Sequence, residues 1–111
     1  MTAAMGEFTI QDLEQRVHER AQAGADVSYT RKLLDRGVAH CAKKFGEEAF
    51  ETALAAVGED RERLIAEAAD LVYHLLVLLK AREVTLAEVE AALAARTRQS
   101  GLDEKAARQR G

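Results

Sequence analysis

Two short acidic motifs hold the side chains of this sequence that are best suited to chemistry. Residues 47–51 read Glu-Glu-Ala-Phe-Glu, and residues 67–70 read Glu-Ala-Ala-Asp. On a helix, positions three or four apart share a face, so each motif can direct two carboxylates at one ion. Four carboxylates form a hard-oxygen site, which suits Mg²⁺ or Mn²⁺ that keeps water ligands and shares phosphate groups. The spacing therefore predicts a divalent-metal site formed by Glu48, Glu51, Glu67 and Asp70.

The second motif lies in the most apolar segment of the chain, residues 61–81. Apolar residues occupy nearly the whole circumference of a helix drawn over this segment, which is typical of a buried helix. Glu67, Asp70 and His74 are the polar exceptions, and spacings of three and four place them on one stripe. Because a buried charge needs a partner or a metal ion, the stripe favours the metal site. For His74, core packing with a hydrogen bond to Asp70 and a role at the site are equally compatible with the sequence.

Basic residues directly precede the first acidic motif. Lys43 and Lys44 could hold phosphate oxygens beside the carboxylates, although a single exposed lysine is more often a plain surface charge. Taken alone, the acids at 47–51 would also be read as a solvated face paired with these lysines. Because the second acidic motif falls at a matching position, the two motifs together favour a metal site over a solvated face.

Five helices are expected to position these residues. Caps and apolar spacing predict them from Thr9 to about Ala23, from Ser28 to about Gly37, from Val38 to the turn at 58–60, over 61–81, and from Thr85 to about Arg98, with a break at 100–101. The short turn at 58–60 makes the third and fourth helices antiparallel neighbours. Glu51 and Glu67 lie about seven residues to either side of this turn, so the two acidic pairs should fall at similar heights.

Composition narrows the class of protein. The chain has 111 residues, no proline and 5% aromatic residues, which predicts a single all-α domain over 1–111, a bundle of four to five helices. A helical domain this small gains from pairing, and the apolar fourth helix predicts a homodimer with that helix at the interface. Residues 1–7 and 109–111 are expected to be poorly ordered tails.

Charge and cysteine content exclude other classes. A net charge of −3 argues against a nucleic-acid surface, and Cys41, as the only cysteine, forms no intrachain disulfide. The N-terminus lacks the pattern of a signal peptide, and no apolar stretch approaches the roughly 20 residues of a membrane span. The sequence therefore predicts a soluble cytoplasmic protein.

The motifs resemble those of a known enzyme family. Residues 43–51 are similar to the Lys-Lys-x-Gly-Glu-Glu-Ala-x-Glu signature of phosphoribosyl-ATP pyrophosphatases, and residues 67–74 are similar to the second motif of that family. The acidic pair itself is shared with a wider all-α nucleoside-triphosphate pyrophosphatase superfamily. Three further motifs resemble those of the phosphoribosyl-ATP pyrophosphatases and indicate phosphoribosyl-ATP as the substrate: Gly-Ala-Asp at 24–26, Ser-Tyr-Thr at 28–30 and Ser-Gly-Leu at 100–102. The likeness extends from about residue 8 to 108, with a departure at Val27, where the family pattern has a longer loop containing proline.

The resemblance implies an activity and roles for the residues. A nucleotide-binding hydrolase of histidine biosynthesis would convert phosphoribosyl-ATP to phosphoribosyl-AMP and pyrophosphate with Mg²⁺, for which Mn²⁺ could substitute. By the same resemblance Glu48, Glu51, Glu67 and Asp70 would ligate Mg²⁺, and Glu47 would hold a further ion or position the water. Lys44 would face the phosphates, and we add Lys43 and His74 as candidate substrate-binding residues. Glu47 or Glu48 could accept the proton of the water. A functional link to phosphoribosyl-AMP cyclohydrolase is implied as well.

Three alternative functions remain open on the sequence. The first is a house-cleaning pyrophosphatase of the wider superfamily, acting on ordinary or aberrant nucleoside triphosphates. The second is a carboxylate-bridged di-iron protein, which is disfavoured because neither motif supplies Glu-x-x-His. The third is a non-enzymatic helical dimerisation domain whose acids are a solvated face. Mg²⁺ dependence and a panel of substrates separate these alternatives.

Overall fold

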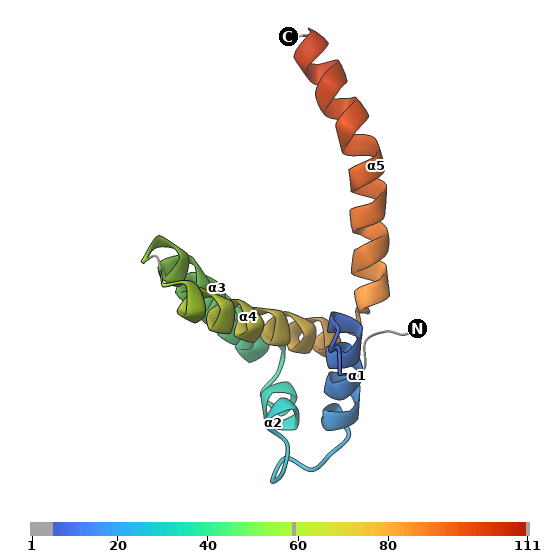
Figure 1. Cartoon of the computed structure of the whole chain (residues 1–111). Coiled ribbons are helices and arrows are strands. Elements are labelled where there is room, and N and C mark those ends of the chain that lie inside the picture. Colours follow the sequence, from blue (N-terminus) through green and yellow to red (C-terminus); the bar gives the residue numbers. More distant parts are fainter. Residues whose placement is uncertain (1–5, 59, 111) are drawn as a thin grey trace.

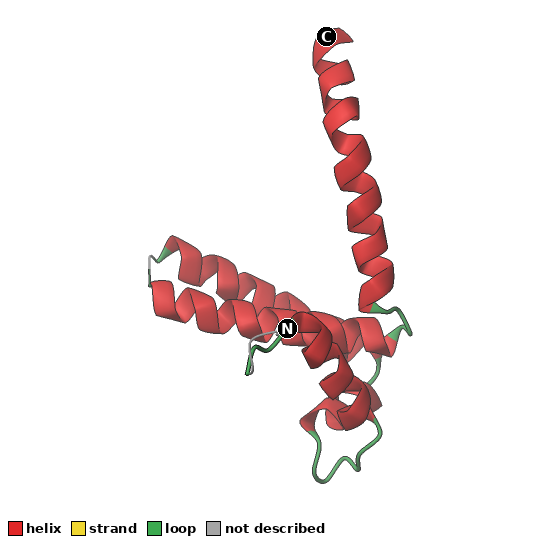
Figure 2. Ribbon diagram, turned by 45° about the vertical axis from the view of Figure 1, so that its right-hand side comes forward, coloured by secondary structure: helices red, strands yellow, loops and turns green. Residues whose placement is uncertain are grey.

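A computed structural model of the chain describes residues 6–58 and 60–110 and contains five helices in that range (Figure 1). No strand occurs among these residues, so the predicted all-α class is confirmed (Figure 2). None of the described helices combines the length and hydrophobicity that a membrane crossing requires. The helices are α1 (Ile10–Ala21), α2 (Tyr29–Asp35), α3 (Val38–Val57), α4 (Arg61–Ala81) and α5 (Leu86–Arg110).

Local side-chain caps set where the helices begin, as the sequence predicts. The Thr9 hydroxyl accepts from the Asp12 N–H at 3.1 Å, and the Asp12 carboxylate accepts from the Thr9 N–H at 3.0 Å. Ser28 caps α2 through the Arg31 N–H at 3.1 Å, and Asp60 caps α4 through the Arg63 N–H at 3.1 Å. Each bond satisfies a backbone donor that a helix start leaves unpaired. The predicted end of α1 at about Ala23 is two residues late.

Helices α3 and α4 form an antiparallel hairpin, which is the most extensive helix–helix contact in the described chain (Figure 1). Helix α1 packs against α2 and α4, and α2 also packs against α3 and α4. The buried hydrophobic cluster lies where these four helices meet, and it contains Val17, Leu33, Cys41, Leu76 and Val77. A hydrogen bond of 2.6 Å between the Thr30 and Tyr73 hydroxyls joins α2 to α4 inside this region.

The expectation that α4 is buried around most of its circumference is only half right. His74, Leu76 and Val77 are buried, whereas Ile65 in the N-terminal half is 56% exposed. The reason is that α1 and α2 cover only the C-terminal half of the helix. Apolar periodicity marks residues that avoid water but does not say which part of the chain, or which other chain, covers them.

The predicted break at Ser100-Gly101 is wrong, because α5 continues without interruption to Arg110. One glycine inside a helix costs only about 1 kcal/mol relative to alanine. The flanking segment is rich in alanine, arginine, glutamine and glutamate and contains no proline, so the helix continues through it. Of the predicted tails, 1–5 and 111 lie outside the described residues, and residues 109 and 110 belong to α5.

Helix α5 stands apart from the other four helices (Figures 1 and 2). Its first residue, Leu86, packs against the buried cluster, and the Leu86 N–H donates to the Glu14 carboxylate at 2.7 Å. Beyond this anchor, the described part of α5 makes no extensive contact with another helix. The positions of the functional residues predicted from sequence are therefore set by α1–α4.

Candidate metal centre

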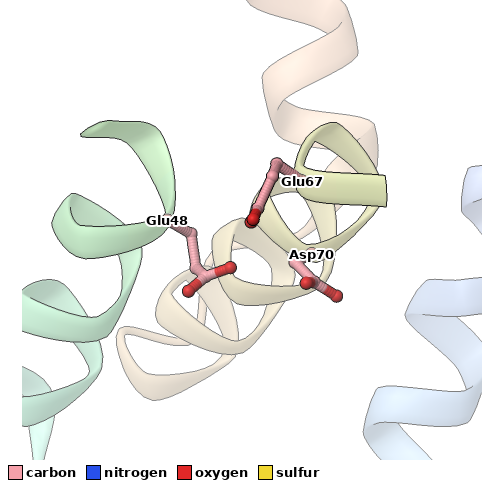
Figure 3. A group of neighbouring side chains, drawn as sticks. All are labelled: Glu48, Glu67 and Asp70. Carbon is pink, nitrogen blue, oxygen red and sulfur yellow. The ribbon is translucent and has the colours of Figure 1, made fainter. Parts of the chain in front are cut away.

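Three carboxylates from two helices converge at the middle of the hairpin (Figure 3). One oxygen each of Glu48, Glu67 and Asp70 lies within 4.8 Å of the others. Glu48 reaches from α3 toward the two acids of α4 (Figure 3). Glu48 and Glu67 are half-buried, whereas Asp70 is exposed, so the group is open to solvent on one side. The prediction that Asp70 is a buried charge is thus wrong, because nothing in the described chain covers that side of α4.

A hydrogen bond between the helices sets this alignment. The Thr52 hydroxyl lies 2.7 Å from the Glu48 carbonyl oxygen one turn earlier and 3.1 Å from the Glu67 carbonyl oxygen on α4. Residue 52 therefore faces residue 67, and one turn along, Glu48 faces Asp70. The two acidic motifs lie at equal heights, as predicted from their distances to the turn. Thr52 itself was missed, because a threonine within a helix carries no sequence signal for such a bond.

The carboxylates of this group repel one another electrostatically. Burial raises the pKa of the Glu48 carboxyl, and the negative charges of Glu51, Asp70 and Glu67 raise it further, while Lys44 opposes them. Like charges held together in this way are stabilised by a cation between them. The donor set is three carboxylate oxygens without histidine or cysteine, and it fits a hard divalent ion such as Mg²⁺. Glu51 lies close enough to act on Glu48 but outside the group of three.

The remaining predicted residues lie around this group. Lys44 forms an ion pair of 3.6 Å with Glu47, and Lys43 is exposed on another side of α3. Glu67 has a cation of its own, because its carboxylate lies 3.7 Å from the Arg63 guanidinium. The geometry places Lys44 and Glu47 beside the carboxylates, whereas among the described residues Lys43 forms no ion pair with them.

His74 is buried, with 7% of its surface exposed. Its ring makes edge-on contacts with Tyr73 at 5.0 Å and with Tyr29 at 6.4 Å between ring centres. Burial lowers the pKa of His74, and the charge of Lys44 lowers it further, while Asp70 and Glu47 act in the opposite direction. His74 is therefore a packed core residue at the edge of the site, and burial favours its neutral form.

A groove of about 470 Å³ adjoins the site between α2 and α3. Lys44 lines it at the end near the carboxylates, and three further basic side chains line the rest, together with the exposed ring of Tyr29. Sequence reasoning missed these basic residues, which are Lys32, Arg36 and His40. A spacing of four residues links them to Lys44, but Gly37 interrupts the helix between them, so only the folded chain brings the two helices' cations together.

Comparison with known proteins places the chain in a family. The family model described as phosphoribosyl-ATP pyrophosphohydrolase matches residues 10–97. A phosphoribosyl-ATP pyrophosphatase of Bradyrhizobium diazoefficiens is 65% identical over 94% of this chain and 98% of the relative. Relatives of the same name from Nitrobacter hamburgensis and Nitrobacter winogradskyi are 63% and 64% identical over 96% of this chain, and over 99% and 91% of their own lengths.

These matches cover both acidic motifs and all the helices that position them. They agree with a geometry in which two helices present carboxylates to one point. The chain belongs to the phosphoribosyl-ATP pyrophosphohydrolase family.

Proposed function

We propose that this protein, acting as a single all-α domain, hydrolyses phosphoribosyl-ATP to phosphoribosyl-AMP and pyrophosphate in histidine biosynthesis, in the cytoplasm. The observation that carries the proposal is the convergence of Glu48, Glu67 and Asp70 in a chain that matches the family over most of its length. The product, phosphoribosyl-AMP, would then pass to a cyclohydrolase.

In this proposal the three converging carboxylates and Glu51 hold Mg²⁺, with Mn²⁺ as a substitute. A divalent ion bound there would neutralise negative charge on the polyphosphate and lower the pKa of a nearby water. Glu51 is included because its charge acts directly on Glu48, and a small movement of its side chain would bring it to the ion. The half-exposed, solvent-facing side of the group leaves room for the phosphate oxygens that complete the coordination.

The side chains around the ion would perform the remaining steps. Glu47 is exposed and one residue from Glu48, and it would orient the attacking water or hold a second ion. Glu47 or Glu48 would accept the proton of the water as its oxygen bonds to the α phosphorus and the bond from that phosphorus to the bridging oxygen breaks. Pyrophosphate then leaves with both electrons of that bond. Lys44, and Lys43 after a change of rotamer, would stabilise the phosphate oxygens.

The test of this function is pyrophosphate release from phosphoribosyl-ATP with and without Mg²⁺. We expect release only with the metal, and loss of at least about 100-fold in kcat for Glu67→Gln. Glu62→Gln is the matched control, since Glu62 is an exposed acid in the first turn of the same helix. Turnover of dNTPs with none of phosphoribosyl-ATP would favour the house-cleaning alternative. A Glu67→Gln variant with the same rate of pyrophosphate release and the same response to Mg²⁺ as the wild type would favour the non-enzymatic domain.

We also propose that the protein is a homodimer. Phe50, Leu54 and Val57 follow one stripe of α3 and are 65%, 49% and 79% exposed, and Ile65 of α4 adds to the apolar surface of the same half of the hairpin. A second hairpin laid against this half would complete a four-helix bundle. On α3 the stripe of Glu47 and Glu51 lies between the α4-facing side and this apolar stripe, so the interface would border the metal centre.

Sedimentation velocity tests the dimer at micromolar concentration. Leu54→Asp should convert the protein to a monomer, because it places a charge in the apolar interface. Val27→Asp is the control, since Val27 is 72% exposed in the loop before α2. A monomeric wild-type protein would contradict the proposal.

A further inference from the structure

The groove between α2 and α3 concentrates positive charge in a protein whose net charge is negative. Lys32 lies on α2, Arg36 caps the C-terminal end of α2, and His40 and Lys44 follow on α3. One acid, Asp35, also lines the groove, but its carboxylate already forms an ion pair of 2.9 Å with Arg31. Lys44 is paired as well, with Glu47 at 3.6 Å, so among the described residues Lys32 and Arg36 supply the excess positive charge that an anion site requires.

The charges of the groove act on one another. Burial lowers the pKa of His40, and the positive charges of Arg36, Lys44 and Lys43 lower it further, while the negative charge of Glu47 acts in the opposite direction. Arg36, His40, Lys32 and Lys44 all line this one groove, so their charges lie close together. A phosphate dianion in the groove would meet the Arg36 guanidinium, which is capable of paired hydrogen bonds, and the ammonium groups of Lys32 and Lys44.

One stripe of α3 leads from the groove toward the metal centre. His40, Lys44, Glu47 and Glu51 follow one another at spacings of four, three and four residues, and such positions share a face. The stripe is basic at the groove and acidic at the metal centre. Seven residues separate His40 from Glu47, which corresponds to roughly 10 Å along the helix axis. A ligand lying along this stripe would present one anionic end to the groove and another to the metal.

Phosphoribosyl-ATP has two such ends, a triphosphate and the phosphate of its separate phosphoribosyl group. We propose that the groove binds the phosphoribosyl group, with its phosphate between Lys32 and Arg36 and its ribose against the exposed ring of Tyr29. The inference rests on the proposed function, in which the metal centre takes the triphosphate. In this proposal the groove distinguishes phosphoribosyl-ATP from ATP, because ATP lacks the phosphate of the phosphoribosyl group.

Kinetics of charge-removing variants test the inference. Lys32→Gln and Arg36→Gln should each raise KM for phosphoribosyl-ATP about tenfold or more, with a much smaller effect on kcat, because each removes a charged contact to the phosphate. The selectivity for phosphoribosyl-ATP over ATP, as a ratio of kcat/KM, should fall by a similar factor. Arg61→Gln is the control, since Arg61 is an exposed arginine at the opposite end of the hairpin. Unchanged KM and selectivity in both groove variants would overturn the inference.

A binding measurement without metal separates this inference from the proposed function. Ribose 5-phosphate, added in EDTA, should shift the NMR signals of the His40 ring in the wild-type protein, and the shift should be lost in the Lys32→Gln, Arg36→Gln double variant. Absence of binding, or equally tight binding of inorganic phosphate, would overturn the inference. A wild-type protein that binds ribose 5-phosphate but does not hydrolyse phosphoribosyl-ATP would refute the proposed function and leave the groove as a sugar-phosphate site.

Discussion

The hydroxyl of Thr52 on α3 donates to the carbonyl oxygen of Glu67 on α4 at 3.1 Å, across the middle of the hairpin. The same hydroxyl lies 2.7 Å from the Glu48 carbonyl oxygen of its own helix, so its single proton is shared between the two acceptors. Both acceptors belong to residues whose carboxylates converge. The bond therefore couples the alignment of the two helices to the geometry of the carboxylate group.

Replacing Thr52 tests that coupling. Thr52→Val keeps the shape of the side chain and removes the hydroxyl, so we expect a loss of about 1 kcal/mol in the free energy of unfolding. Mg²⁺ affinity should fall as well, because the two helices are no longer held in one alignment. Urea denaturation and Mg²⁺ titration measure the two effects. Thr52→Ser is the control and should stay close to wild type. Unaltered Mg²⁺ binding in Thr52→Val would show that packing alone sets the alignment.

The carboxylates at the edge of the centre give the second prediction. Asp70→Asn and Glu51→Gln should each abolish turnover, since each removes a negative charge from the metal site, while the helical circular dichroism stays largely intact. Both side chains are at least partly exposed, so their loss leaves no cavity in the core. Pyrophosphate release measures the effect. A near-wild-type rate in either variant would remove that residue from the proposed ligand set.

Repulsion among the carboxylates leads to a prediction about stability. The pKa of Glu48 is raised in the folded protein, first by burial and then by the neighbouring acids. A carboxyl with a raised folded pKa loses stabilising effect as pH rises through that pKa, so ionised Glu48 destabilises the metal-free protein at pH 7. Glu48→Gln should therefore raise Tm in EDTA, by about 1–3 °C after allowance for solvent screening.

The same variant should respond differently to metal. Mg²⁺ should raise Tm of the wild-type protein, because an ion that binds only the folded state stabilises it. In Glu48→Gln that increase should be lost or strongly reduced. Differential scanning fluorimetry with and without Mg²⁺ measures both effects. A lower Tm of the variant in EDTA would mean that Glu48 stabilises the fold by other contacts and that repulsion is not dominant.

His74 gives a prediction for how the stability of the fold depends on pH. Its pKa is lowered from the ordinary 6.5, first by burial and then by Lys44. The unfolded chain therefore takes up a proton at higher pH than the folded one, so stability is present above pH 6.5 and is lost as pH falls through the lowered pKa. His74→Phe keeps a ring against Tyr29 and Tyr73 and cannot titrate. Between pH 7.5 and 5.5, Tm should fall more in the wild type than in this variant. Parallel pH profiles would contradict the lowered pKa.

Gly46 provides a prediction for the middle of α3. A Cβ added at this position would meet no atom within 4 Å in the described chain, and its φ is not positive. Gly46→Ala should therefore stabilise the helix by about 1 kcal/mol, measured by urea denaturation. Ala49→Gly one turn later should have the opposite effect. A destabilised Gly46→Ala would indicate that a partner or ligand approaches the backbone closely there.

Much of the fold could be predicted from the sequence because the signals are local. The caps at Thr9, Ser28 and Asp60 bond to backbone groups three residues away, so neighbouring residues alone define those helix starts. The equal heights of Glu48 and Asp70 follow from a short turn and a fixed rise per residue. The motif at 47–51 and its counterpart at 67–70 therefore predict a metal site from the sequence alone, and their residue types and order also point to the family.

Other features depend on contacts between segments that are distant in sequence. The sequence could not show that Asp70 is exposed or that Ile65 is uncovered, because burial depends on which helix packs where. It did not reveal the groove either, in which Lys32 and Arg36 of one helix meet His40 and Lys44 of the next. The sequence by itself determined the capped helix starts, the carboxylates and their spacing, since these follow from local bonds and helical geometry. Only the tertiary structure decided which side of the hairpin is open, because that depends on long-range packing.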